Sequence, residues 1–266
     1  MLKDITLGQY YPADSIVHKL DPRVKLLATL VFIVSVFLAD HVNIYVCIAL
    51  VVAAVIGVSQ IPLKYVLKGM KPILWIIIIT AVLNMLLTSG EVVWEWGVLH
   101  VTKEGISLAI RMAVKITLLV TGAQLLTLTT TPNSLTDGLE KGLRPLNKLH
   151  VPVFEIALMM SIALRFIPVL IEETDKITKA QKARGADLET GNIFKRAKNM
   201  IPILVPLFVS ALRRANDLAL AMEARCYHGG AGRTRLHPLK YRGRDAIGYI
   251  LIAAYLAGVI ILRILL

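Results

Sequence analysis

The sequence contains few of the residues that build metal centres, disulfide frameworks or catalytic sites. Its 266 residues include two cysteines and six histidines, and no two histidines stand at metal-ligand spacing. Cys47 lies in an apolar run and Cys226 in a basic segment, so no disulfide is predicted. The phosphate-binding pattern Gly-x-x-x-x-Gly-Lys-[Ser/Thr] is absent. We therefore expect this chain to bind no metal or other cofactor and to be no enzyme by itself.

Acidic residues are also scarce. The chain has 18 Asp and Glu against 30 Lys and Arg, which gives a formal net charge of +12. Hydrophobic residues make up 56% of it, more than a soluble domain with a solvated surface needs. The composition indicates a membrane protein, in which excess positive charge on one membrane face needs no nucleic-acid partner.

Five apolar stretches approach the length that crosses a bilayer core of about 30 Å. The first two are short and are separated by Asp40 and His41, which predicts a tight helical hairpin. The fourth carries Arg111 and Lys115, which we expect to reach headgroups or to face other helices. The stretches are residues 24–39, 42–58, 73–88, 106–128 and 247–266.

The distribution of charge predicts the orientation of these spans. The N-terminal segment is polar and lacks the pattern of a signal peptide, so the first span is expected to direct insertion. Segments 1–25, 59–72 and 129–246 are basic, whereas loops 40–41 and 89–105 are not. Loop 89–105 offers Trp94 and Trp96 as interfacial anchors. The positive-inside rule then predicts five spans with a cytoplasmic N-terminus.

The segment 129–244 is too long and too charged to be a loop, and three helices are predicted in it. Asn133 or Ser134 would cap a short helix that ends near Asn147. A long helix would cover 154–184, with Gly185 just beyond it, and a third would run from near Pro202 to about Arg225.

The predicted fold is therefore all-α, a polytopic membrane helical domain with a cytoplasmic helical coupling domain. The membrane domain covers residues 1–128, the coupling domain 129–244, and a final transmembrane helix 245–266. The stretch 154–170 has a competing interpretation as a sixth span, although Glu155 and Arg165 argue against full exposure to lipid.

Two short segments of the predicted coupling domain repeat one pattern. AQKARGAD at 180–187 and AMEARCYH at 221–228 both read Ala-x-x-Ala-Arg followed by a small residue. Each places a single long cation at a helix C-terminus, and the planar fork of an arginine suits an acidic pocket of a partner. A purely structural interpretation also exists, because basic residues and glycine are common at helix ends. The repetition favours docking through Ala183, Arg184, Gly185, Ala224, Arg225 and Cys226.

The N-terminal segment YPADSIVHKLDPRVKLL, residues 11–27, carries the pattern Ser-x-x-His-x-Leu-Asp-Pro-Arg-x-Lys. Asp21 and Pro22 predict a cap and a helix start where the chain enters the membrane. This pattern and the paired Ala-Arg motifs resemble the transmembrane T component of energy-coupling factor (ECF) vitamin importers along essentially the whole chain. The resemblance predicts a membrane-entry motif made of His18, Asp21, Pro22, Arg23 and Lys25.

The resemblance implies a chain in a bacterial cell membrane that joins two cytoplasmic ABC-type ATPases to an interchangeable substrate-capture membrane protein. ATP and Mg²⁺ would be bound by the ATPases. Arg184 and Arg225 would insert into grooves of the two ATPases, on helices that cross at the cytoplasmic side. Two positions depart from the family, Ala13 where glycine is common and Cys226 where glycine or serine is frequent, and neither removes an arginine.

Other surfaces of the predicted coupling domain suggest further partners. Apolar residues at helical spacing on its long helix would pack in a core by default, but an adaptable methionine-containing face also suits docking of capture proteins. The residues are Met159, Met160, Ala163, Phe166 and Ile167, with Ile162 and Leu170. Two basic groups are predicted to contact anionic lipid headgroups, namely Lys195, Arg196 and Lys198, and Arg233, Arg235, Lys240, Arg242 and Arg244.

The main alternative function is that of a self-sufficient secondary transporter or channel. Such a protein should carry acidic or histidine residues inside its spans for ion coupling, and the spans up to Thr88 contain none. A membrane enzyme is disfavoured because no nucleophile and base pair is recognisable. The sequence therefore predicts a coupling scaffold of an ATP-driven importer.

Overall fold

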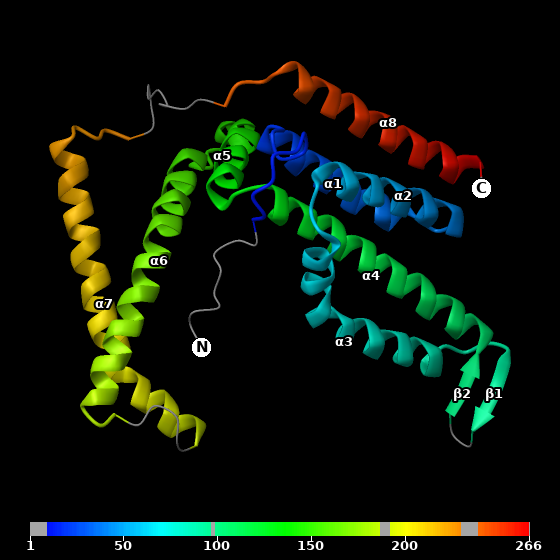
Figure 1. Ribbon diagram of the computed structural model, residues 1–266, viewed down its shortest axis with the longest axis horizontal. Helices are drawn as coiled ribbons and strands as arrows, with labels where there is room; N and C mark the ends of the chain where they lie inside the picture. Colours follow the sequence, from blue (N-terminus) through cyan, green and yellow to red (C-terminus); the bar gives the residue numbers. More distant parts are fainter. Residues whose placement is uncertain (1–9, 97–98, 187–191, 230–238, 266) are drawn as a thin grey trace. The chain divides into compact units, whose positions relative to one another are not determined.

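The computed structural model describes residues 10–96, 99–186, 192–229 and 239–265 (Figure 1). In these residues the chain forms eight α-helices, one 3₁₀ helix and one two-stranded hairpin, which confirms the predicted all-α fold. The chain divides into two compact units, one containing Gly8–Lys141 and Leu239–Leu266 and the other Gly142–Pro238. We call them the membrane unit and the α6–α7 unit.

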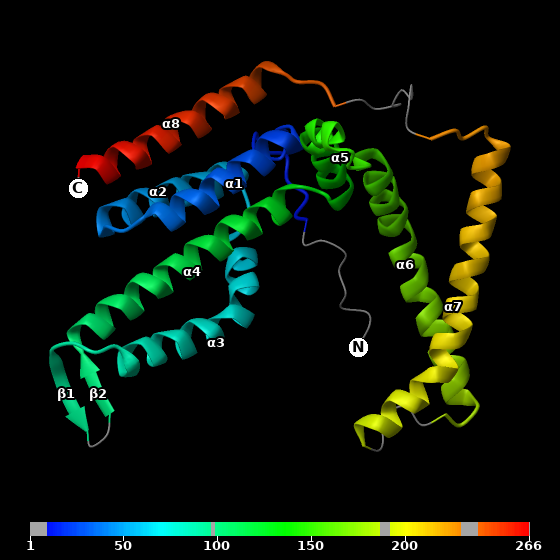
Figure 2. The same ribbon diagram turned by 180° about the vertical axis from the view of Figure 1, so that it is seen from behind.

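The membrane unit is organised around helix α4 (Lys103–Thr129). Helices α1 (Pro22–Leu38), α2 (Val42–Ser59) and α3 (Leu63–Leu87) all pack on α4, and α8 (Gly243–Leu265) packs on α1 and α2. Both views show α4 running between α3 and the pair α1 and α2 (Figures 1 and 2). Its core contains Val36, Ile44, Ile48, Leu128 and Val259.

Five helices in the described residues are long and apolar enough to cross a membrane, namely α2, α3, α4, α6 (Val153–Ala183) and α8. Four of them correspond to predicted spans. The fifth predicted span corresponds to α1, which is not among these five helices. Helix α1 has 17 residues, which is about 26 Å of helix. Helix α6 contains the stretch with the competing interpretation as a span, so the choice between five and six spans stays a prediction.

Two connections predicted as loops contain regular structure. Helix α3 begins at Leu63 and has Pro72 inside it, so most of the predicted loop 59–72 is helical. Its leucine and lysine residues favour a helix, and an internal proline kinks a helix without necessarily ending it. The predicted loop 89–105 contains the antiparallel strands β1 (Val92–Trp96) and β2 (Leu99–Thr102), whose β-branched and aromatic residues favour strands. The side chains of Trp94 and Trp96 lie outside the described residues.

The short helix α5 (Pro132–Leu143) belongs mainly to the membrane unit, although we predicted it in the coupling domain. A Cβ at Gly138 would lie 2.8 Å from Cβ of Pro22, so α5 and the start of α1 are in close contact. Its start is two or three residues earlier than predicted, because Thr131 and not Asn133 or Ser134 caps it, and Thr131 Oγ1 accepts a hydrogen bond from Ser134 N at 3.3 Å. The 3₁₀ helix η2 (Arg144–Leu149) follows.

The α6–α7 unit is a pair of long helices. Helix α6 covers the predicted range, but α7 (Ile193–Ala224) starts well before Pro202, where we predicted it to begin. Pro202 and Pro206 lie inside α7, and the helix changes direction in this region (Figure 1). The prediction was wrong because these prolines bend a helix that has already started.

The contact between α3 and α4 depends on a glycine. A Cβ at Gly105 would lie 2.9 Å from the backbone oxygens of Asn84 and Met85, so Gly105→Ala should cost about 1–3 kcal/mol through overpacking. Gly57→Ala is the matched control, because a Cβ there meets nothing within 4 Å. Thermal unfolding in mild detergent should show a lower midpoint for the Gly105 variant alone. Equal midpoints would contradict this packing.

Candidate functional site

The end of α6 carries the first Ala-Arg motif. Arg184 is the C-cap, and Gly185 follows with a left-handed φ of 86°. Gly185 N donates to Lys182 O at 3.0 Å and Ala186 N to Gln181 O at 3.0 Å. This pair of hydrogen bonds defines a Schellman motif, which satisfies carbonyl oxygens that a helix end leaves without partners.

The end of α7 repeats this geometry with a different residue in the left-handed position. Cys226 has a φ of 55°, where the first motif has glycine. Its N–H donates to Glu223 O at 2.9 Å, and Tyr227 N donates to Met222 O at 3.0 Å. The two motifs are therefore the same helix-terminating structure, with an arginine at the same position of each.

Both arginines are available for an interaction with another molecule. Arg184 and Arg225 are exposed, and neither forms an ion pair with the described residues. A Cβ at Gly185 would meet nothing within 4 Å, so a surface can approach this helix end closely. The negative end of the helix dipole favours a cation here by a few tenths to about 1 kcal/mol. Each end thus presents a planar donor fork suited to a carboxylate.

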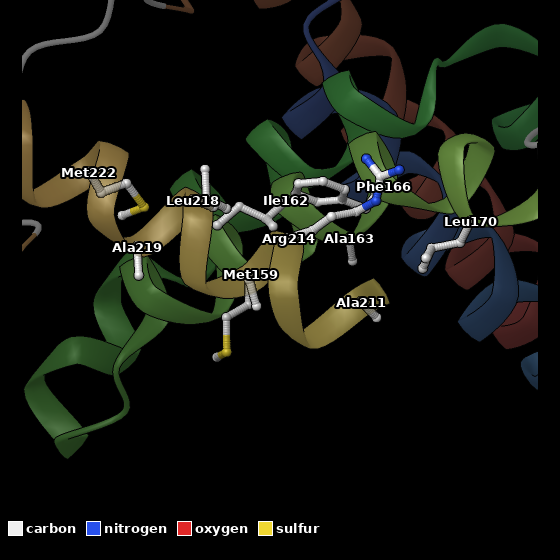
Figure 3. Close-up of a pocket in the computed structure, with 11 residues that line it drawn as sticks. Met159, Ile162, Ala163, Phe166, Leu170, Ala211, Arg214, Leu218, Ala219 and Met222 are labelled. Atoms are coloured by element: carbon white, nitrogen blue, oxygen red, sulfur yellow. The ribbon is translucent and has the colours of Figure 1, made fainter. Parts of the chain in front are cut away.

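An apolar groove of about 380 Å³ lies between α6 and α7 (Figure 3). On α6 it is lined by Met159, Ala163 and Phe166 of the predicted docking face, with Ile162 and Leu170. Met160 and Ile167, which we also predicted there, are not among the lining residues. The lining positions recur every three or four residues on one helix face, and 160 and 167 fall on the neighbouring face.

The other wall of the groove was not predicted from the sequence. Helix α7 contributes Ala211, Arg214, Ala215, Leu218, Ala219 and Met222. Alanines four positions apart at 211, 215 and 219 were a signal for close helix packing. Arg214 Nη2 donates to Glu173 Oε2 at 3.0 Å, and Ser210 Oγ donates to Glu173 Oε1 at 2.5 Å. These polar contacts join the two helices beside the groove.

The N-terminal pattern forms a separate hydrogen-bonded cluster in the membrane unit. His18 Nε2 lies 3.0 Å from Tyr11 O, and Nδ1 lies 2.7 Å from Ser15 Oγ. Because a carbonyl only accepts, Nε2 carries the proton and Nδ1 accepts from Ser15. Burial, together with the positive charge of Lys25, lowers the pKa of His18 below its usual 6.5 despite the bond to Tyr11. This histidine is therefore neutral at pH 7.

Asp21 and Pro22 begin α1 as predicted. The side chain of Asp21 accepts from Arg23 N at 2.9 Å and from Arg23 Nη2 at 2.9 Å. Burial alone would raise the pKa of Asp21, but these bonds from Arg23 outweigh it and the pKa is lowered. Asp21 N donates at 2.8 Å to Asp245, which is 2% exposed and also accepts from Arg242 N. The starts of α1 and α8 are thereby joined.

Lys25 joins the same cluster to the end of α4. Its side chain is buried, and Nζ donates to His18 O at 3.0 Å and to Thr129 O at 2.8 Å. Thr129 is the last residue of α4, where a cation is favoured by the helix dipole. His18, Asp21, Pro22, Arg23 and Lys25 therefore hold helix ends together, which is a structural role in the described contacts.

The two predicted basic groups are only partly described. Lys195, Arg196, Lys198, Lys240 and Arg242 are exposed, and Arg244 is half-buried. Arg233 and Arg235 lie outside the described residues.

Comparison with known proteins shows similarity along nearly the whole chain. Residues 13–237 match the family described as CbiQ, cobalt transport protein. The chain is 49% identical over 263 residues to the energy-coupling factor transporter transmembrane protein EcfT of Ruminiclostridium cellulolyticum, covering 99% of this chain and 98% of the relative. It is 54% identical to EcfT of Clostridium kluyveri, and the match covers 93% of this chain and 92% of the relative. It is 46% identical to EcfT of Bacillus subtilis, and the match covers 96% of this chain and 98% of the relative.

The two helix ends should respond in opposite ways to exchanges at the left-handed position. Gly185→Ala introduces a side chain where φ is 86°, at a cost of roughly 1–2 kcal/mol, whereas Cys226→Gly removes a comparable strain. Hydrogen exchange should become faster at the end of α6 in the first variant and slower at the end of α7 in the second. Changes of the same sign would contradict the shared geometry.

The neutral state of His18 predicts a pH dependence of stability. Its folded-state pKa lies below the unfolded value of 6.5, so the unfolded chain binds the proton more readily. The full contribution to stability is present above pH 6.5 and decreases as the pH falls toward the folded pKa. His18→Gln retains an N–H donor without this titration, so its thermal unfolding midpoint should change less between neutral and mildly acidic pH. An equal change in both proteins would contradict the assignment.

Proposed function

Because the chain belongs to the CbiQ family and is the transmembrane component of an energy-coupling factor transporter, we propose that it transmits ATPase motions through Arg184 and Arg225. Two ABC-type ATPases would bind one arginine each. A separate membrane protein would capture the substrate, a vitamin or another micronutrient. ATP and Mg²⁺ would be bound by the ATPases, and this chain would carry out no catalysis.

The observation that supports this proposal most is the equivalence of the two helix ends. A partner pair with similar pockets needs two similar projections, and the Schellman motifs provide them on separate helices. The end of a long helix is also a good mechanical contact, since a force on it is carried along the whole hydrogen-bonded element. Helices α6 and α7 have 31 and 32 residues.

The groove between α6 and α7 supports the second half of the proposal. It is apolar and contains Met159 and Met222, whose flexible thioether side chains can adapt to different partner surfaces. A capture protein that is exchanged for others needs such an adaptable contact. In the proposed arrangement α6 and α7 lie on the cytoplasmic side, in agreement with the basic residues of segment 129–246.

A self-sufficient transporter is the alternative that this proposal replaces. The relatives are named as transmembrane proteins of an energy-coupling factor transporter, a name that describes one component of a larger assembly. Coupling to ATPases is thus the function that the helix ends and the relatives support best.

Co-purification with the ATPases tests this function. Arg184→Glu with Arg225→Glu would place like charges at each contact and should cost several kcal/mol, so ATPase recovery should fall well over tenfold. Lysine at both positions should give intermediate recovery, because the charge is kept and the fork is lost. Arg213→Glu is the control for each single exchange, Arg184→Glu or Arg225→Glu, since Arg213 is exposed in the middle of α7.

All variants must be compared at equal amounts of folded, membrane-inserted protein. Full recovery of the ATPases with both glutamates present would mean that the ATPases dock on another surface of this chain. Loss of the ATPases in the Arg213 control as well would show that net charge, and not the helix ends, controls assembly.

A further inference from the structure

We propose that the first part of α7, residues 193–201, is an in-plane amphipathic anchor that binds the surface of an anionic phospholipid bilayer. This inference rests on the proposed placement of α6 and α7 on the cytoplasmic membrane face. It concerns residues that the helix ends and the groove do not use. Headgroup contacts were predicted for Lys195, Arg196 and Lys198. The proposal adds that the apolar face beside these residues enters the same bilayer.

Apolar side chains on this part of α7 are exposed. Phe194 is 86% exposed, Met200 48% and Ile201 51%, and the exposed stripe continues through Leu204 and Phe208. At 100° per residue these positions fall on one side of the helix. Ile203 lies on the opposite side of the helix from Phe194 and is buried, so the packed side of this part of α7 is opposite the stripe. The apolar face therefore points away from the interior of the α6–α7 unit.

The charges beside this face fit an anionic surface. Lys195 and Lys198 border it on one side and Arg196 borders it on the other, and all three are exposed. From Asn192 to Asn216 the sequence contains no acidic residue. A helix with an apolar face bordered by lysine and arginine is typical of segments that lie at the boundary of headgroups and acyl chains. The cations then meet lipid phosphates while the apolar side chains enter the acyl region.

The position of the segment favours lipid over the proposed capture protein. The α7 wall of the groove starts at Ala211, beyond both internal prolines. The region of these prolines turns the first part of α7 away from the rest of the helix (Figure 1). A protein seated in the groove therefore does not need to cover residues 193–201, and the bilayer is the partner whose charge and apolar interior match this face.

Spin-label accessibility in nanodiscs tests the proposal. The full chain, with Cys47 and Cys226 replaced, would carry a label at Phe194→Cys or at the control site Leu220→Cys, which is exposed beside Asp217 and Glu223. Discs of phosphatidylcholine with and without phosphatidylglycerol would be compared. At position 194 the label should become more accessible to oxygen and less accessible to a nickel chelate in the anionic discs, whereas position 220 should not respond.

Charge removal provides the second arm of the experiment. Lys195→Gln, Arg196→Gln and Lys198→Gln together should reduce the anionic-lipid response at position 194 about tenfold or more. The matched control removes three cations of α6, through Lys176→Gln, Lys179→Gln and Lys182→Gln, and should keep the response. Equal loss in both triple variants would overturn a local anchor in favour of diffuse electrostatic attraction.

Two further results would also overturn the proposal. One is a label at position 194 that stays accessible to the nickel chelate in both kinds of disc. The other is a label at position 194 that loses its accessibility to the nickel chelate only when a substrate-capture protein is added. This result would mean that the capture protein, and not lipid, covers the apolar face. ATPase recovery in detergent separates this inference from the proposed function, because no bilayer is present there and the triple variant of residues 195, 196 and 198 should retain the ATPases.

Discussion

The first N–H groups and the last carbonyl oxygens of a helix have no partners within it, and finding those partners organises both units of this chain. In the membrane unit the partners are side chains from distant parts of the sequence. Asp21 caps α1, Asp245 accepts from the backbone at the starts of α1 and α8, and Lys25 donates to the last carbonyl of α4. Three helices are thus fixed to one another at a single cluster of buried polar groups.

In the α6–α7 unit the backbone itself completes the helix ends. Gly185 and Cys226 adopt left-handed conformations that fold the chain back onto the last turn. Because the backbone satisfies these carbonyls, the side chains of Arg184 and Arg225 are not needed as caps and remain exposed. The structural and the docking interpretations of the repeated motif are therefore compatible, since the termination of the helix is what leaves the arginine available.

Local signals in the sequence predicted the features that depend on neighbouring residues. The start of α1 at Asp21-Pro22 and the end of α6 at Arg184-Gly185 follow from capping preferences, and both are present. Features that depend on distant residues were not predictable in this way. Asp245 lies 224 positions from Asp21, and the α7 wall of the groove becomes visible only when α6 is packed against it. The start of α7 was predicted too late, because a proline can either begin a helix or bend one that has already started.

Contact between the two helix ends and the ATPases is tested most directly by photo-crosslinking in the assembled transporter. A photoreactive residue at position 183 or 224 would stand beside each arginine without replacing it. Both positions should crosslink to ATPase subunits, while the same residue at position 212, on the exposed middle of α7, should not. ATPases that assemble with the chain yet crosslink at neither helix end would contradict the account.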